Sequence, residues 1–151
     1  MHEKCCTFFG HRSCPPEIKS KLYNTLEDLI VNQGVTVFYV GNQGSFDGMV
    51  RSVLRELSQQ YPHITYAVVL AYLPSESKGK LSQSQGYTDT IYPDGIETIP
   101  KRFAIDWRNR WLLKQADYVV TYITHSWGGA ARFADKAVKS SKQVINLGAD
   151  G

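Results

Sequence analysis

The chain has 151 residues, of which 42% are hydrophobic and 21% charged, and its formal net charge is +3 at pH 7. This length suits one domain with a single core, and no stretch reaches the ~20 apolar residues that a bilayer-spanning helix needs. The N-terminal segment lacks the apolar core of a signal peptide, and three cysteines cannot all pair within the chain. We therefore expect a single cytoplasmic domain over residues 1–151, and the slight charge argues against a nucleic-acid partner but leaves room for a basic pocket that binds a small anion.

Apolar runs alternate with helical patterns along the first half of the chain. Ile18, Leu22 and Leu26 recur on one helical face of a segment that opens with prolines and is followed by Gly34, which are typical start and stop signals. In chain order, the expected elements are a strand over Cys5–Phe9, a helix between Pro15 and Gly34, a strand over Val35–Val40, a helix over residues 46–61 and a strand over Ile64–Leu73.

The second half opens with a polar excursion, Pro74–Pro100, that is rich in Ser, Gly, Gln and Lys. Within it only "DTIYPDGIETI" suggests a small strand or turn, so the excursion is either a lid or binding loop or simply a mobile segment. The elements expected after it are a helix over about Lys101–Ala116, a strand over Tyr118–Ile123, a helix over Ala130–Ser140 and a strand over Gln143–Leu147.

The predicted strands are almost continuously apolar, which is typical of strands covered on both faces. Their alternation with helices predicts an α/β fold, namely a doubly wound, mainly parallel sheet of about five strands with helices on both faces. In such a sheet, ligands bind beyond the carboxyl ends of the strands, where the strand order reverses. The turns that follow the strands are therefore the candidate site.

Three of these turns contain glycine and lead toward a helix: "GHR" (10–12), "GNQGSFDG" (41–48) and "HSWGG" (125–129). Glycine allows close approach to the backbone, and the first turn of a helix presents unpaired N–H groups and the positive end of the helix dipole. A phosphate suits such a hollow, although the sequence matches neither GxGxxG nor GxxxxGK[ST]. The candidate ligand-binding residues on these turns are Gly10, His11, Arg12, Gly41, Asn42, Gly44, Ser45, Asp47, His125, Ser126, Trp127, Gly128 and Gly129.

Three side chains on these turns carry charge or titrate. Arg12 is suited to clamp a phosphate or carboxylate with two hydrogen bonds, and the alternative is an ordinary surface arginine. His11 and His125 are either ligand contacts or hydrogen-bonded structural histidines.

The stretch "RFAIDWRNRWLLKQAD" interleaves arginines with Trp107 and Trp111. We interpret it mainly as an amphipathic helix whose tryptophans pack on the sheet, while Arg108 and Asn109 could face the ligand crevice and join the candidate ligand-binding residues. Interleaved arginine and aromatic residues also suit single-stranded nucleic acid, but the net charge gives that interpretation no support.

A zinc site is the remaining chemistry to consider, because "CCTFFGHRSC" contains three cysteines and a histidine. Adjacent residues of a strand point to opposite faces, so Cys5 and Cys6 cannot easily share one ion. Cys14 has no partner in the sequence that would mark it as a nucleophile. We expect no metal site and no cofactor.

Taken together, "FFGHR", "GNQGSFDGMV", "WRNRWLLKQADYVV" and "WGGAARFADKAVKSSKQVINL" resemble the SLOG superfamily. This Rossmann-like group contains the LOG phosphoribohydrolases, the DNA-processing Smf proteins and nucleotide-sensing domains found beside TIR proteins. The resemblance covers nearly the whole chain and is nearest to the stand-alone YpsA-like branch. It implies that a nucleotide or nucleotide-derived sugar binds at the glycine-rich loops, and it allows a homo-oligomer, with Phe103, Trp107 and Trp111 as a self-association face.

LOG enzymes carry PGGxGTxxE, in which the glycine loop holds the phosphate and the glutamate assists cleavage of an N-glycosidic bond. Laid over "WGGAARFAD", both glycines match, Trp127 replaces the proline, Arg132 replaces the threonine and Asp135 falls at the glutamate. Aspartate is one methylene shorter, and a misplacement of about 1 Å can cost about 10²-fold in rate. Binding could therefore survive where catalysis did not.

Three functions follow from this resemblance. The leading hypothesis is a protein that senses or sequesters a nucleotide-derived ligand such as an ADP-ribose-type molecule. The alternative is a LOG-like N-glycosidase that acts on a nucleoside monophosphate, with Asp135 or Glu97 as the catalytic carboxylate. The third, ranked last, is a module associated with single-stranded DNA, by analogy with the Smf proteins.

Overall fold

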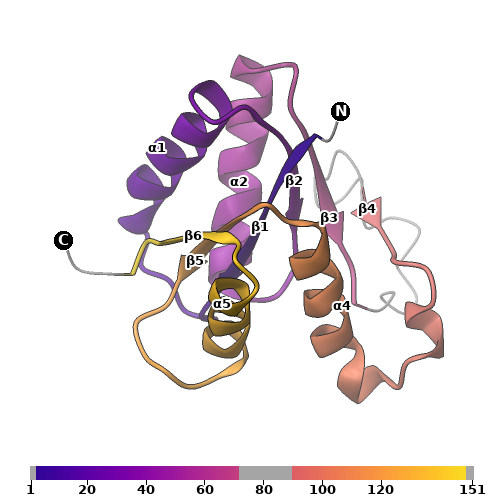
Figure 1. Cartoon of the computed structure of the whole chain (residues 1–151). Helices are drawn as coiled ribbons and strands as arrows, with labels where there is room; N and C mark the ends of the chain where they lie inside the picture. Colours follow the sequence, from indigo (N-terminus) through magenta and orange to yellow (C-terminus); the bar gives the residue numbers. More distant parts are fainter. Residues whose placement is uncertain (1–2, 72–89, 149–151) are drawn as a thin grey trace.

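The computed structural model describes residues 3–71 and 90–148, and Figure 1 shows its helices arranged around a central sheet. Each predicted strand and helix in this part of the chain is present, with ends shifted by a few residues. In chain order the elements are β1 (Lys4–Gly10), α1 (Ile18–Val31), β2 (Val35–Val40), α2 (Gly44–Gln60), β3 (Thr65–Val69), β4 (Thr90–Ile91), the 3-10 helix η2 (Ile96–Thr98), α4 (Lys101–Gln115), β5 (Tyr118–Tyr122), α5 (Gly129–Lys139) and β6 (Gln143–Asn146).

The described strands form one parallel sheet of six strands in the order β4-β3-β2-β1-β5-β6. The prediction of a mainly parallel α/β sheet is confirmed, and the strand beyond the expected five is the two-residue β4. β4 lies in "DTIYPDGIETI", the part of the polar excursion in which the sequence suggests a small strand or turn, and residues 74–89 of that excursion lie outside the described residues. The choice between a lid and a mobile segment therefore stays open.

Two apolar cores cover the two faces of the sheet, because neighbouring residues of a strand point to opposite sides. Phe8 packs with α1 and α2 on one face, whereas Phe9 packs with α4 and α5 on the other. Val68 and Val69 divide in the same way along β3. The prediction of helices on both faces is confirmed.

The third strand ends earlier than its apolar run predicts. The run continues to Leu73, but the strand stops at Val69, and Leu70 and Ala71 are buried without belonging to it. The amide of Leu70 still donates a hydrogen bond to the carbonyl of Ile91, 2.9 Å away. The hydrophobicity of Leu70 and Ala71 therefore indicates that they are buried, not that they belong to the strand. Among the helices of residues 3–71 and 90–148, none is long and apolar enough to cross a bilayer.

The strand order reverses at β1. From β1 the chain moves outward through β2 and β3 to β4, then returns across the sheet to place β5 on the other side of β1. The connections that leave β1 and β5 therefore diverge to opposite faces of the sheet and open a crevice at the carboxyl ends of these strands.

Candidate functional site

A cavity of about 250 Å³ occupies this crevice. Its walls come from β1 and the turn after it, the turn between β2 and α2, one face of α4 and the start of α5. The predicted residues that it brings together are Gly10, Arg12, Gly41, Asp47, Arg108, Asn109 and Gly129. The other lining residues are Phe8, Phe9, Gln43, Ile105, Leu112 and Ala130.

Arg12 lies at the mouth of the cavity on the turn that follows β1. Its carbonyl oxygen accepts hydrogen bonds from the amide and the hydroxyl of Ser45, each at 2.7 Å, and the Ser45 hydroxyl in turn accepts the amide of Cys14 at 2.7 Å. These bonds fix the Arg12 backbone against the first turn of α2. The exposed guanidinium makes no hydrogen bond or ion pair with any described residue, so it can receive an anion.

The floor of the cavity holds a buried positive and a buried negative group. Arg108 is 2% exposed, and its Nη1 donates to the carbonyl of Val69 at 2.8 Å. Asp47 is 8% exposed, and its Oδ2 accepts the amide of Gln43 at 2.9 Å. A Cβ on Gly41 would lie 2.9 Å from both Arg108 Nη1 and Asp47 Oδ2, so only glycine leaves room for this pair.

Burial raises the pKa of Asp47, because a low-dielectric environment disfavours the charged carboxylate. The Gln43 amide and the charges of Arg108 and Arg51 act in the opposite direction. With Arg12 at the mouth, positive groups outnumber the one carboxylate among the charged side chains that line the cavity. The arrangement therefore favours an anionic ligand.

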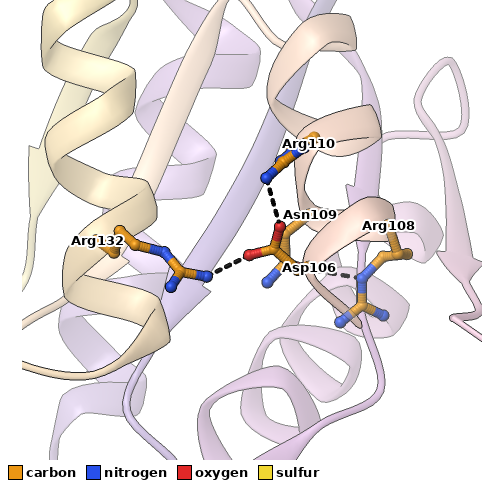
Figure 2. Close-up of polar contacts among 5 residues, drawn as sticks. All are labelled: Asp106, Arg108, Asn109, Arg110 and Arg132. Carbon is orange, nitrogen blue, oxygen red and sulfur yellow. Dashed lines mark hydrogen bonds and ion pairs between the residues drawn. The ribbon is translucent and has the colours of Figure 1, made fainter. Parts of the chain in front are cut away.

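Figure 2 shows how α4 divides its polar residues between two directions. Arg108 and Asn109 line the cavity, and Arg108 Nε donates to Asn109 Oδ1 at 2.9 Å. Asp106 instead pairs with Arg110 at 2.9 Å and with Arg132 of α5. The helix thus contributes one guanidinium to the cavity, and the Asp106–Arg132 ion pair joins α4 to α5.

The tryptophans of α4 are half-buried, and only Trp111 packs on the sheet as the amphipathic interpretation predicts. Trp111 packs against Tyr39 with a ring-centroid distance of 5.4 Å. Trp107 packs against a small cluster formed by Ala71, Ile96 and Ala104.

Three further predicted residues form a stack of rings beside the cavity rather than lining it. His11 stacks on His125 with a centroid distance of 3.6 Å and an interplanar angle of 12°. His125 stacks on Trp127 at 3.8 Å and 18°. His11 Nε2 accepts the amide of Thr124 at 3.0 Å, so the ring joins the turn after β1 to the turn after β5.

The remaining predicted ligand residues lie at the edges. Ser45 is engaged in the turn contacts described above, and Asn42 Oδ1 accepts Gln43 Nε2 at 3.3 Å. Gly44 and Gly128 stand at the starts of α2 and α5, and Ser126 borders a second hollow.

The lining residues that sequence reasoning missed are Phe8, Phe9, Gln43, Ile105, Leu112 and Ala130. Helical spacing carried the signal for two of them, because Ile105 and Leu112 lie three residues before and four after Arg108.

Neither candidate catalytic carboxylate lines the cavity. Asp135 is exposed, pairs with Lys139 at 2.9 Å and borders the second hollow, which lies along α5 and the β5–β6 edge. Glu97 is exposed in η2. The buried carboxylate at the cavity is Asp47, which the sequence placed only among the binding residues.

The cysteines are free thiols, and burial raises the pKa of Cys5 to about 12. Across residues 3–71 and 90–148, no three His, Cys, Asp or Glu side chains gather in a way that could hold a metal ion.

The fold is similar to that of DNA processing protein A, DprA. The X-ray structure of DprA from Streptococcus pneumoniae matches with a TM-score of 0.65 at 14% identity, over 96% of this chain and 50% of that one. A structure of DprA from Helicobacter pylori, described as giving insight into its single-stranded DNA binding mode, matches with a TM-score of 0.65 at 15% identity, over 96% of this chain and 65% of that one. This chain thus spans between half and two thirds of either protein. No protein-family model and no curated protein matches the sequence.

These similarities confirm a Rossmann-like fold, which is the fold that the SLOG resemblance implied. They also correct one expectation. The expectation that a nucleic-acid partner is unlikely is contradicted, because the same fold occurs in a protein described as binding single-stranded DNA. That expectation relied on the net charge of +3, which sums the whole chain and does not register positive groups gathered at one cavity.

Proposed function

We propose that the cavity binds the phosphate and sugar of one nucleotide, and that the nucleotide belongs to a single strand of DNA. The observation that carries this proposal is Arg12. Its guanidinium has no partner among the described residues, and it lines a cavity whose floor holds the buried Arg108.

The chemistry of the lining suits a phosphodiester. Arginine binds phosphate oxygens through two parallel hydrogen bonds, and such charge-assisted bonds are stronger than neutral ones. Gly129 brings the first turn of α5, with its unpaired amides and positive dipole end, to the same cavity. Asn109 supplies an amide that can bind a sugar or base oxygen.

Two observations favour a strand over a free nucleotide. The fold is shared with DprA, for which a single-stranded DNA binding mode is described. The cavity of about 250 Å³ also falls below the ~300–1,000 Å³ of sites that enclose a drug-sized ligand, so part of a nucleotide stays outside it.

The test is fluorescence anisotropy with a labelled oligothymidylate at several salt concentrations. Arg12→Ala should weaken binding about 10- to 150-fold, which corresponds to the ~1.5–3 kcal/mol of a charge-assisted hydrogen bond. It should also lower the slope of log affinity against log salt by about 0.7. The matched control is Arg55→Ala, which removes an exposed arginine that does not line the cavity and should bind like the wild type. Equal binding by both variants would remove the proposed role of the cavity.

A free nucleotide-derived ligand, such as an ADP-ribose-type molecule, is the second candidate, because the floor of the cavity is concave and buried. A competition experiment decides between them. If ADP-ribose or a nucleoside monophosphate displaces the labelled oligonucleotide at a lower concentration than the unlabelled oligonucleotide does, the small ligand is favoured. The N-glycosidase has less support, since Asp135 and Glu97 lie outside the lining. Placement in the YpsA-like branch and self-association stay predictions.

A further inference from the structure

We propose that the outer face of Trp127 is a stacking platform for an unpaired nucleobase, belonging to the same strand whose phosphate Arg12 binds. This inference rests on the proposed function and specifies how the part of the nucleotide outside the cavity is held.

The platform is an exposed ring with one covered face. Trp127 is 69% exposed, whereas its neighbour in the stack, His125, lies against its inner face at a centroid distance of 3.8 Å. The other tryptophans are partly buried in the packing of α4. Tryptophan is enriched at binding interfaces, because its ring offers a large apolar face together with a polar N–H.

The ring is held in place before any ligand arrives. His11 Nε2 accepts the Thr124 amide, which fixes the neutral ring with its proton on Nδ1. His125 Nδ1 lies 3.0 Å from the carbonyl of Trp127 and so ties that ring to the backbone beside the tryptophan. A preorganised ring lowers the entropic cost of binding, because little freedom is left to lose.

The platform is continuous with the cavity along the chain. His11, at the base of the stack, lies between Gly10 and Arg12, which both line the cavity, and Trp127 comes two residues before Gly129, which lines it as well. A nucleotide with its phosphate at Arg12 therefore has an aromatic surface within the same turns. Stacking accepts every base, because each has a flat π-face.

The experiment compares Trp127→Ala and Trp127→Phe for binding to an oligothymidylate and to an abasic oligonucleotide of equal length. Base–aromatic stacking is worth ~1–3 kcal/mol, so Trp127→Ala should bind oligothymidylate about 5- to 150-fold more weakly, and Trp127→Phe should retain most of the affinity. On the abasic strand, Trp127→Ala and wild type should bind alike. Oligothymidylate should quench tryptophan fluorescence in the wild type and not in Trp127→Phe, in which Trp107 and Trp111 remain as internal emitters.

The outcomes separate this inference from the proposed function. If Arg12→Ala weakens binding but Trp127→Ala does not, the cavity stands and the platform is overturned. If the wild type binds neither oligonucleotide, both fall. If Trp127→Ala instead converts a dimer into a monomer in sedimentation, a second copy of the chain covers the ring, and the platform is again overturned.

Discussion

Two hollows border α5, and they differ in whether their charged side chains are buried or exposed. The cavity at the end of β1 takes Gly129 and Ala130 from the first turn of the helix, and its floor carries the buried Asp47 and Arg108. The second hollow takes residues further along α5, among them Asp135, which is exposed and engaged with a neighbour on the helix surface. Burying a charged side chain costs free energy, so buried charges are expected only where they interact with a ligand or stabilise the fold. The comparison therefore favours the first hollow as the site.

The largest expected difference between the hollows is the stability cost of losing a carboxylate. Asp47→Ala removes the acceptor of the Gln43 amide at the start of α2 and takes away a negative charge that interacts with the buried Arg108. We expect it to lower the free energy of unfolding by about 3 kcal/mol in urea titrations at neutral pH. Asp135→Ala, which breaks only an exposed pair, should cost less than about 0.5 kcal/mol. If the two variants lose the same free energy of unfolding, the buried carboxylate of Asp47 does not stabilise the cavity floor as described.

A second contrast concerns the glycines that face the cavity. A Cβ on Gly10 would overlap the ring of Phe46, which is fully buried, whereas nothing lies within 4 Å of a Cβ on Gly129. Gly10→Ala should therefore overpack the core and lose about 1–3 kcal/mol, or roughly 2–12 °C in Tm by calorimetry. Gly129→Ala should leave Tm unchanged or slightly raised. If Gly10→Ala melts with the wild type, the packing of α2 against β1 is not as described.

An arginine at the second hollow tests whether that hollow takes part in oligonucleotide binding. Arg132 borders the second hollow and pairs with Asp106, so Arg132→Ala should lower stability by no more than about 1 kcal/mol. Its affinity for oligothymidylate should equal that of the wild type. Weaker binding by this variant in the anisotropy assay would move the nucleic-acid surface to the second hollow.

The smallest effect is a pH dependence at the ring stack. Desolvation, with a further contribution from His125, lowers the pKa of His11 below its ordinary 6.5. The unfolded chain therefore binds more protons than the folded one as the pH falls through 6.5, and the folded state loses stability there. His11→Gln should lose less stability than the wild type between pH 7 and 5 in thermal melts. His63→Gln, at an exposed histidine, serves as control and should follow the wild type; identical profiles for all three proteins would exclude this effect.

Periodicity and turn residues predicted the order and type of the elements because they report local burial and backbone geometry. They failed where the apolar run continued past the end of its strand, at Leu70 and Ala71. The end of a strand depends on which neighbouring strand is available for pairing, and local sequence does not specify that neighbour.

The lining of the cavity was predictable at the turns and at Arg108 and Asn109 of α4, but not along α5. Glycine-rich strand ends located the cavity, but the motif alignment put Asp135 at the catalytic position. An α-helix turns by roughly 100° per residue, so a residue six positions after Gly129 faces a direction roughly 240° away. The same geometry separates Arg108, at the cavity, from Asp106 and Arg110, which pair away from it. The ring stack joins two turns more than a hundred residues apart, and no local pattern predicts that contact.

The central claim is that a nucleotide phosphate binds in the cavity at the end of β1. Amide chemical shifts recorded by NMR during titration with a short oligothymidylate test it most directly. The account predicts saturable shifts at Arg12, Gly41 and Gly129, with Asp135 and Val138 in the second hollow unchanged. Shifts confined to the second hollow, or none at the three cavity amides while the strand is bound, would contradict it.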